Sequence, residues 1–364
     1  MKSFFRRIAF CLVILMFASS TYVGAVAPQP DNTQLIISQV SKMLPLLCDL
    51  SDVASPIYLG DKVSAYHTGS NSNSIISSDY DVYPILANSK LLAFANVTTY
   101  SDSQISVTCT TSYVDELNEF FDTFGVVPFA LVYTDTGAYV STDSIAQYWL
   151  KEDSTISSNL TANLEMGSLL SQYPITVNFP ALSTQTASAI DYDAIRISNV
   201  ANGRCTTCPE GSSCRNGLCW AASIAMIVNY YSGTSYTAQQ IHQVCPSLTD
   251  AYHDDEIRYL TSYGLTANGP YSNSFTFSNV KYHVNNETLM LLDLQYHTDN
   301  ADSAHDIVAY GYFNNPDEDT RYFYFMDPNN TGNSICAFPS SGSVTTITTS
   351  GRAYTLHCYI TARE

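Results

Sequence analysis

Cys219 has the residue type and the surroundings that nucleophilic catalysis needs. It follows a glycine-containing turn and stands at the start of a helical pattern, whose one face carries Ala222, Met226 and Tyr230. Gly233 is a C-terminal stop signal for that helix. The positive end of a helix dipole favours a thiolate over a thiol, so the sequence predicts that Cys219 is a nucleophile.

Two downstream residues could activate and orient this thiol. His305 begins an apolar strand pattern and is the predicted base, and Asp327 stands at the end of a later strand and is the predicted partner of the imidazole. Adjacent side chains of a strand point to opposite faces, so Asp306 should point away from His305. The competing histidines are His242, His253, His297 and His357.

The elements around these residues indicate an α+β domain. After the nucleophile helix, helices are predicted over 237–244, which opens with a capping-box pattern, and from 254 to a stop at Gly264. Strands are predicted over 289–296, 305–313, 321–326 and 354–360. Helices followed by an antiparallel sheet are the α+β order.

Residues from about 200 to 364 resemble a papain-like cysteine peptidase of the compact bacterial C39-like or staphopain-like branch. The resemblance rests on Gly217-Leu218-Cys219-Trp220, on His305 with its strand, and on Asp327-Pro328. It implies a catalytic domain of N-terminal helices packed on an antiparallel sheet, with a separate α+β prodomain before it. It also implies that Cys219 attacks an amide carbonyl, that His305 carries the proton, and that Asp327 orients the imidazole.

One position departs from the papain-like pattern. These enzymes usually place a glutamine six residues before the nucleophile, where its amide helps to form the oxyanion hole, and this chain has Ser213 there. Ser213 or Asn216 is the candidate side-chain donor, and the backbone amide of Cys219 is the other donor.

The N-terminus predicts export. Residues 1–25 combine Lys2, Arg6 and Arg7 with an apolar run over 8–18 and a small-residue cleavage site ending at Ala25. We therefore expect a secreted, extracellular protein with no membrane contact once this signal is removed. The alternative is an uncleaved anchor, although the apolar run is short for a membrane span.

Charge restricts the partners. The chain has 15 Lys and Arg residues against 33 Asp and Glu residues, a net charge of −18. Nucleic acid and anionic membranes require basic patches and are not expected to bind. We expect a monomer that needs no cofactor, with a protein or peptide as substrate.

The length suggests two domains. Residues 28–171 form the predicted prodomain, 172–204 a linker with a processing site, and 205–364 the peptidase domain. A cut is predicted in the linker, with the bond after Arg204 as one candidate. The first region lacks a catalytic cluster, and its one histidine, His67, is predicted to be exposed. It therefore fits an inhibitor of the enzyme, and the alternative is a binding or spacer module.

Ten cysteines fit an oxidising compartment. Cys11 leaves with the signal, so eight cysteines can pair while Cys219 stays free. Cys48 and Cys109 would pair within the first region. The remaining candidates, whose connectivity stays open, are Cys205, Cys208, Cys214, Cys245, Cys336 and Cys358. No metal site is predicted, although zinc at Cys205, Cys208, Cys214 and Cys245 is an alternative use of four of them.

Three functions remain open. The first is a secreted cysteine endopeptidase made as a zymogen, which acts through an acyl-enzyme thioester. The second keeps this chemistry but acts on cell-wall peptidoglycan as an amidase or endopeptidase. The third is a secreted binding protein with an inactive papain-like domain. Cys219, His305 and Asp327 in this order favour an active enzyme.

Overall fold

The computed structural model describes residues 32–364, apart from 51–52, 54–55, 69–73, 89, 102–103, 153–163, 168, 170, 178–189, 206, 209–216, 245–252, 273–274, 299–300 and 340–341. The predicted signal at 1–25 lies outside the described residues. Among the helices that are described, none combines the length and the apolar character needed to cross a membrane.

One large sheet runs through both regions of the chain. Its path is β10-β1-β4-β5-β6-β16-β15-β14-β13-β18-β12, with β11 added beside β14 and β17 beside β18. The strands before residue 205 are β1 (Ile57–Gly60), β4 (Asp81–Ala87), β5 (Lys90–Ser101), β6 (Gln104–Thr110), β10 (Ser171–Ile175) and β11 (Asp191–Ala194), of which β11 lies in the predicted linker. The others are β12 (Thr266–Ser272), β13 (Leu289–Thr298), β14 (Ala301–Asn315), β15 (Thr320–Met326), β16 (Asn333–Ala337), β17 (Thr346–Thr349) and β18 (Arg352–Arg363).

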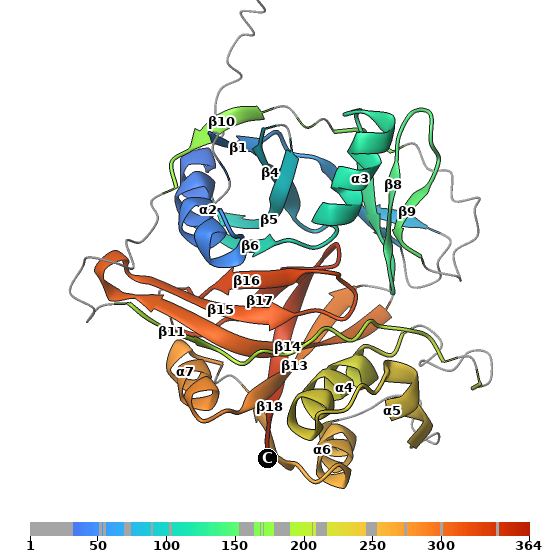
Figure 1. The fold of residues 1–364 in the computed structure, drawn as a ribbon, viewed down its shortest axis with the longest axis vertical. Coiled ribbons are helices and arrows are strands. Elements are labelled where there is room, and N and C mark those ends of the chain that lie inside the picture. Colours follow the sequence, from blue (N-terminus) through green and yellow to red (C-terminus); the bar gives the residue numbers. More distant parts are fainter. Residues whose placement is uncertain are drawn as a thin grey trace, which may run out of the picture.

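The two regions meet where β6 pairs antiparallel with β16, with Cys109 opposite Ile335. Helix α2 (Thr33–Leu47) covers this junction, and its Val40, Met43 and Leu44 are buried there. Figure 1 shows α2 above β6, with the strands of the C-terminal region continuing below. In this arrangement the N-terminal region extends the sheet of the C-terminal region. The separate prodomain that the sequence predicts stays a prediction.

A smaller sheet and one helix complete the N-terminal region. The sheet has the order β3-β2-β7-β8-β9. Its strands are β2 (Ser64–Thr68), β3 (Ile75–Ser77), β7 (Ala130–Tyr133), β8 (Ala138–Ser141) and β9 (Tyr148–Lys151). Helix α3 (Val114–Phe124) packs Leu117 and Phe120 into the core between the two sheets. Gly125 ends α3, and β7 pairs antiparallel with β8 as a hairpin.

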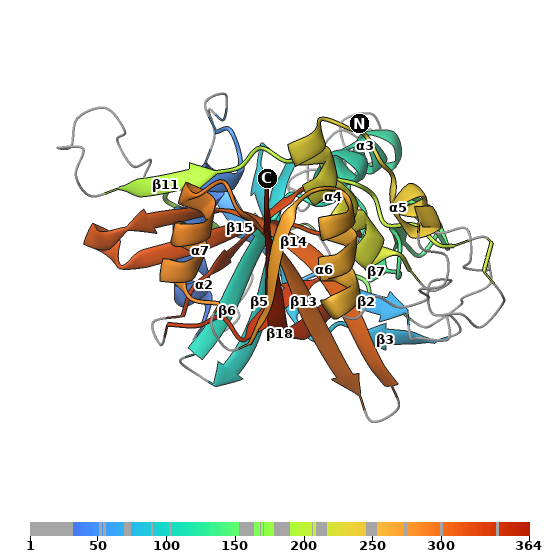
Figure 2. The same ribbon diagram turned by 90° about the horizontal axis from the view of Figure 1, so that it is seen from below.

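Helices α4 (Cys219–Ser232), α5 (Ala238–Val244) and α6 (His253–Ser262) lie together on one side of the C-terminal strands (Figures 1 and 2). Helix α4 is the inner one, because every residue from Trp220 to Val228 is buried. Gly233 ends α4 in the left-handed conformation, as predicted. Tyr230 is 37 % exposed, so it lies outside the buried face on which the sequence pattern places it.

Local signals explain which elements the sequence predicts. The capping box of α5 forms in both directions, since Gln240 N donates to Thr237 Oγ1 and Thr237 N donates to Gln240 Oε1. Helix α7 (Phe277–Asn285) was not predicted, because it is short and buries few of its side chains, chiefly Val280 and Val284. Thr276 caps it by accepting from Asn279 N.

The prediction that His67 is exposed is wrong. Its side chain lies on β2 and is 3 % exposed, because the turn between β17 and β18 covers it. Gly351 in this turn has φ +81°, and a Cβ there would lie 3.0 Å from His67 Cβ and 2.9 Å from Tyr133 Cδ2. The close approach of the two regions at this turn therefore requires glycine.

We predict that Gly351→Ala destabilises the full chain more than Gly342→Ala does. Both glycines have positive φ, at +81° and +107°, but nothing lies within 4 Å of a Cβ at Gly342. The backbone strain of about 1–2 kcal/mol is common to both variants. Overpacking at Gly351 adds about 1–3 kcal/mol. Urea unfolding curves measure the difference, and equal midpoints for the two variants would contradict it.

Candidate active site

Cys219 is the first residue of α4 and is partly exposed. The turn before it is fixed by Asn202, whose Oδ1 accepts hydrogen bonds from Gly203 N at 2.8 Å and Leu218 N at 2.7 Å. The fully buried Leu218 also anchors the start of the helix. The thiol therefore stands at the positive end of a rigid, buried helix, as the sequence predicts.

The predicted base and its partner lie together. His305 on β14 and Asp327 after β15 are 3 % and 0 % exposed, and His305 Nε2 is 2.9 Å from Asp327 Oδ1. The other nitrogen of the ring, Nδ1, is then left for the thiol, and Cys219 is near enough to hydrogen-bond with the imidazole. The three residues form the nucleophile, base and orienter arrangement of a catalytic triad.

Asp327 is held by four further donors. Its Oδ1 accepts from Asn329 N at 2.7 Å, and its Oδ2 accepts from Asn330 Nδ2, Thr349 Oγ1 and Ser350 Oγ at 3.2, 2.5 and 2.9 Å. A buried carboxylate without such partners would be strongly destabilising. These donors therefore keep Asp327 ionised and fix its position.

The charges of the buried pair support each other. Burial alone lowers the pKa of His305, but the Asp327 carboxylate outweighs it and holds the pKa well above the ordinary value. Burial alone raises the pKa of Asp327, but the imidazolium and the hydrogen bonds lower it below its ordinary value. The protonated imidazole is thus stabilised beside the Cys219 thiol.

Asn202 is a site residue that sequence reasoning missed. Besides fixing the Cys219 turn, its Nδ2 donates to Asn329 Oδ1 at 2.6 Å, and its backbone N donates to Pro328 O at 2.8 Å. It therefore couples the turn of the nucleophile to the loop that follows Asp327. Its place directly before Gly203 marks a turn, but no local pattern reveals a contact with residues more than 120 positions away.

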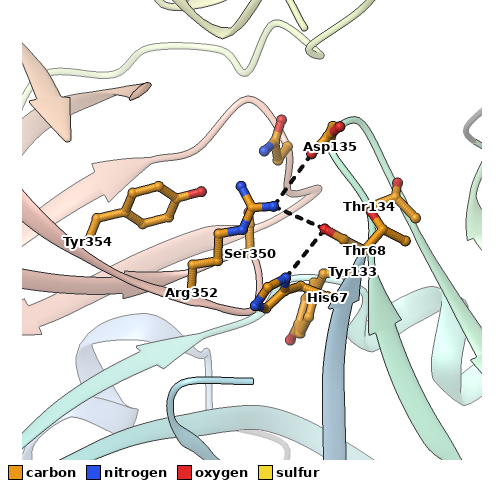
Figure 3. Close-up of a pocket in the computed structure, with 9 residues that line it drawn as sticks. His67, Thr68, Tyr133, Thr134, Asp135, Ser350, Arg352 and Tyr354 are labelled. Carbon is orange, nitrogen blue, oxygen red and sulfur yellow. Dashed lines mark hydrogen bonds and ion pairs between the residues drawn. The ribbon is translucent and has the colours of Figure 1, made fainter. Parts of the chain in front are cut away.

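The aromatic neighbour of the imidazole comes from β18. The ring of Tyr354 lies 5.4 Å from that of His305, and Tyr354 also lines a small pocket with Arg352 and Ser350. The N-terminal region closes the other side of this pocket with His67, Tyr133 and the turn at Asp135 (Figure 3).

The N-terminal region also holds the loop after Asp327. Tyr113 Oη donates to Asn329 O at 2.5 Å, and Lys151 Nζ donates to Pro328 O and Asn329 O at 3.0 and 3.2 Å. Residues far apart in the sequence thus meet within two positions of the Asp327 carboxylate.

Other sequence-predicted residues lie elsewhere. Ser213 and Asn216, the candidate oxyanion donors, lie outside the described residues, as does the side chain of His297. Asp306 interacts with Glu256. His253 and His357 both approach Asp293, and His242 Nε2 lies 3.9 Å from Cys208 Sγ. None of these histidines contacts Asp327 within the described structure.

The cysteine pairings stay predictions. Cys48, Cys109, Cys205, Cys336 and Cys358 carry thiols in this structure, and Cys214 and Cys245 lie outside the described residues. Cys109 is buried close to both Cys48 and Cys336, and burial raises its pKa far above the ordinary value. Cys205 and Cys208 lie beside His242 rather than forming a disulfide.

We predict that Asp327→Asn lowers the pKa of His305 below its ordinary value, because burial then acts without the carboxylate. Alkylation of Cys219 at neutral pH should become about ten- to a hundredfold slower, because a neutral His305 gives the attacking sulfur less electrostatic support. NMR titration of the imidazole and alkylation rates measure both effects. The control is Asp317→Asn, at an exposed position. If Asp327→Asn left the titration of His305 unchanged, the role given to the carboxylate would be refuted.

Residues 210–341 match the family described as papain-like cysteine protease AvrRpt2, and this segment contains Cys219, His305 and Asp327. A comparison with curated proteins found no match. The C39-like or staphopain-like branch stays a prediction. The site geometry and the match agree on the chemistry, and the chain, which is similar to papain-like enzymes, is a cysteine peptidase, a hydrolase that acts on peptide bonds.

Proposed function

We propose that the chain is a secreted cysteine endopeptidase made as a zymogen. The observation that carries this proposal is the fully buried His305–Asp327 pair within hydrogen-bonding reach of Cys219 at the start of α4. An inactive binding protein would have no need to maintain a buried ion pair that is stable only with its donors in place.

In the first half-reaction the Cys219 thiolate attacks the carbonyl carbon of the peptide bond. The backbone amide of Cys219 stabilises the oxyanion. The imidazolium of His305 gives its proton to the leaving amine, and a thioester remains on Cys219. Asp327 keeps the ring oriented through the 2.9 Å contact with Nε2.

In the second half-reaction neutral His305 takes a proton from water, and the resulting hydroxide attacks the thioester carbonyl. The products are a carboxylic acid and the Cys219 thiolate with protonated His305. Because the pKa of His305 is raised, the imidazolium persists above the ordinary pH range of histidine. We therefore expect the alkaline limb of the pH–activity profile to lie at higher pH than a free histidine would give.

The N-terminal region is proposed to act as the inhibitor. Support comes from its contacts around the triad, where Lys151 and Tyr113 bind the loop after Asp327, and Asp135 pairs with Arg352 beside Tyr354. These contacts support the proposal, because a region bound beside the triad would restrict the approach of a substrate.

Activation is proposed to follow a cut between β10 and β11. Strand β10 pairs with β1 of the N-terminal region, and β11 pairs with β14 of the catalytic region, so this connection joins the two. A cut after Arg204, the other candidate, would have to open the ion pair of Arg204 with Asp135 at 3.8 Å.

We predict that secreted wild-type protein cuts itself between residues 172 and 204 under mild reduction and digests casein, whereas Cys219→Ala does neither. The residual casein activity should be at least about 10⁴-fold lower, because the variant has no nucleophile. Intact mass and a fluorescent casein assay measure the two outcomes. Wild-type protein that is cut but releases only cell-wall fragments would point to peptidoglycan as substrate, and two unreactive proteins would favour the binding protein.

We predict that Lys151→Met raises the casein activity of the uncut precursor by about tenfold. It removes a charge-assisted contact of about 1.5–3 kcal/mol that holds the N-terminal region on the Asp327 loop. Initial rates, with gels that confirm the uncut state, measure this effect. The control is Lys62→Met, since Lys62 is exposed and pairs with Asp81 inside the N-terminal region. Lower activity in Lys151→Met would show that the region supports the loop rather than inhibiting it.

A further inference from the structure

A second cluster of reactive side chains lies apart from the triad, on α6, β13 and β18. It consists of His253, Asp293, His357 and Cys358, and each offers a ligand atom within 4.8 Å of all the others. The peptidase mechanism uses none of these residues. Imidazole, carboxylate and thiolate are the three ligand types of protein zinc sites.

A bulge in the sheet brings these residues to one face. Asp293 pairs with Cys358, but the next residue, Leu294, pairs with Leu356, so β18 has His357 as an extra residue. Such a bulge re-aims the side chain of the extra residue. In agreement, His357 Nδ1 lies 3.0 Å from Asp293 Oδ2, whereas regular alternation would send the side chains of His357 and Cys358 to opposite faces.

The distances between the ligand atoms fit a tetrahedral zinc ion. With bonds of about 2.0–2.1 Å to nitrogen or oxygen and 2.3 Å to sulfur, the edges of the tetrahedron measure about 3.3–3.6 Å. Cys358 Sγ lies 3.6 Å from the His253 ring nitrogens and 3.9 Å from Asp293 Oδ2, and His253 Nε2 lies 3.4 Å from the same oxygen. Small shifts of these side chains would bring the ligand atoms within bonding distance of one ion.

The buried acidic side chains around this cluster favour a bound cation. Glu256 Oε2 is buried, accepts no hydrogen bond from any described residue, and lies 3.8 Å from His253 Nδ1. Asp306 is buried beside Glu256 and opposite Asp293. In the described part of the chain, no Lys or Arg forms an ion pair with any of these three carboxylates. In their ionised forms these buried groups would be strongly unfavourable without a cation, and a divalent ion would balance their charge.

We propose that His253, Asp293, His357 and Cys358 bind one zinc ion. A thiolate with two imidazoles selects zinc over calcium or magnesium, and Glu256 takes the place of the carboxylate that orients a ligating histidine. Four protein ligands leave no open position, which is the pattern of a structural site.

The ion would fasten α6 to the sheet beneath the nucleophile helix. Tyr259 of α6 packs its ring 5.2 Å from that of Trp220, which directly follows Cys219 in α4. The zinc site would therefore support the position of the nucleophile without contacting substrate. It also gives Cys358 a use that excludes the disulfide for which the sequence made it a candidate.

The test uses the full chain with Cys219→Ala, so that neither the catalytic thiol nor self-cutting interferes. Reduced protein is loaded with zinc, desalted and analysed by elemental mass spectrometry. We expect that His357→Asn, whose side chain is 45 % exposed and tolerates substitution, lowers the zinc content by about one ion per chain. Zinc should also raise the thermal unfolding midpoint of the parent chain more than that of His357→Asn.

Cobalt(II) identifies the thiolate ligand through its sulfur-to-metal charge-transfer absorption. We expect Cys358→Ser to weaken this absorption, while Cys336→Ser, a buried cysteine on β16 away from the cluster, leaves it unchanged. Cys205, Cys208 and His242 form another group that could hold a metal ion. Cys205→Ser removes one of its ligands and so distinguishes metal bound there from metal bound at Cys358. Zinc content and cobalt spectra unaffected by both His357→Asn and Cys358→Ser would overturn the proposal, as would a Cys358 disulfide in unreduced secreted protein.

Discussion

The candidate active site depends on one buried charge, the Asp327 carboxylate. With no exposed surface, it must obtain every compensating interaction from the protein, and it does so from His305, from its own turn and from the β17–β18 turn. Each donor can stabilise the carboxylate only if the segment that carries the donor is held in place. Asn202 ties the same loop to the start of α4, so the nucleophile, the base and the carboxylate are positioned by one connected set of hydrogen bonds.

The continuous sheet has a consequence for the relation between the two regions. Because β6 pairs with β16 and α2 packs over the junction, the N-terminal region shares a hydrophobic core with the catalytic region. A cut between β10 and β11 would therefore leave two pieces that still hold together through strand pairing and buried apolar surface. Activation by cleavage would act by loosening local contacts such as those of Lys151 and Tyr113, not by simple dissociation of a separate domain.

Two adjacent residues of β14 point to opposite faces of the sheet. His305 faces Asp327 and Tyr354, while Asp306 faces Glu256 and lies in the row of Asp293 and Cys358. The period-2 alternation of a strand thus separates the His305–Asp327 pair from the buried acidic groups behind it. Helix α4 is bonded directly to this strand, since its Ser223 Oγ donates to Asp306 O at 2.9 Å.

The sequence by itself determined the features that depend on neighbouring residues. The cap of α5, the glycine ends of α3 and α4, the β7–β8 hairpin and the strands around His305 and Asp327 follow from propensity and periodicity over a few positions. Only the tertiary structure decided the burial of His67, the role of Asn202, the bulge at His357 and the joining of β6 to β16. These features arise from contacts between segments that are distant in the sequence. No local sequence pattern indicates which distant segment will pair with a given strand or turn.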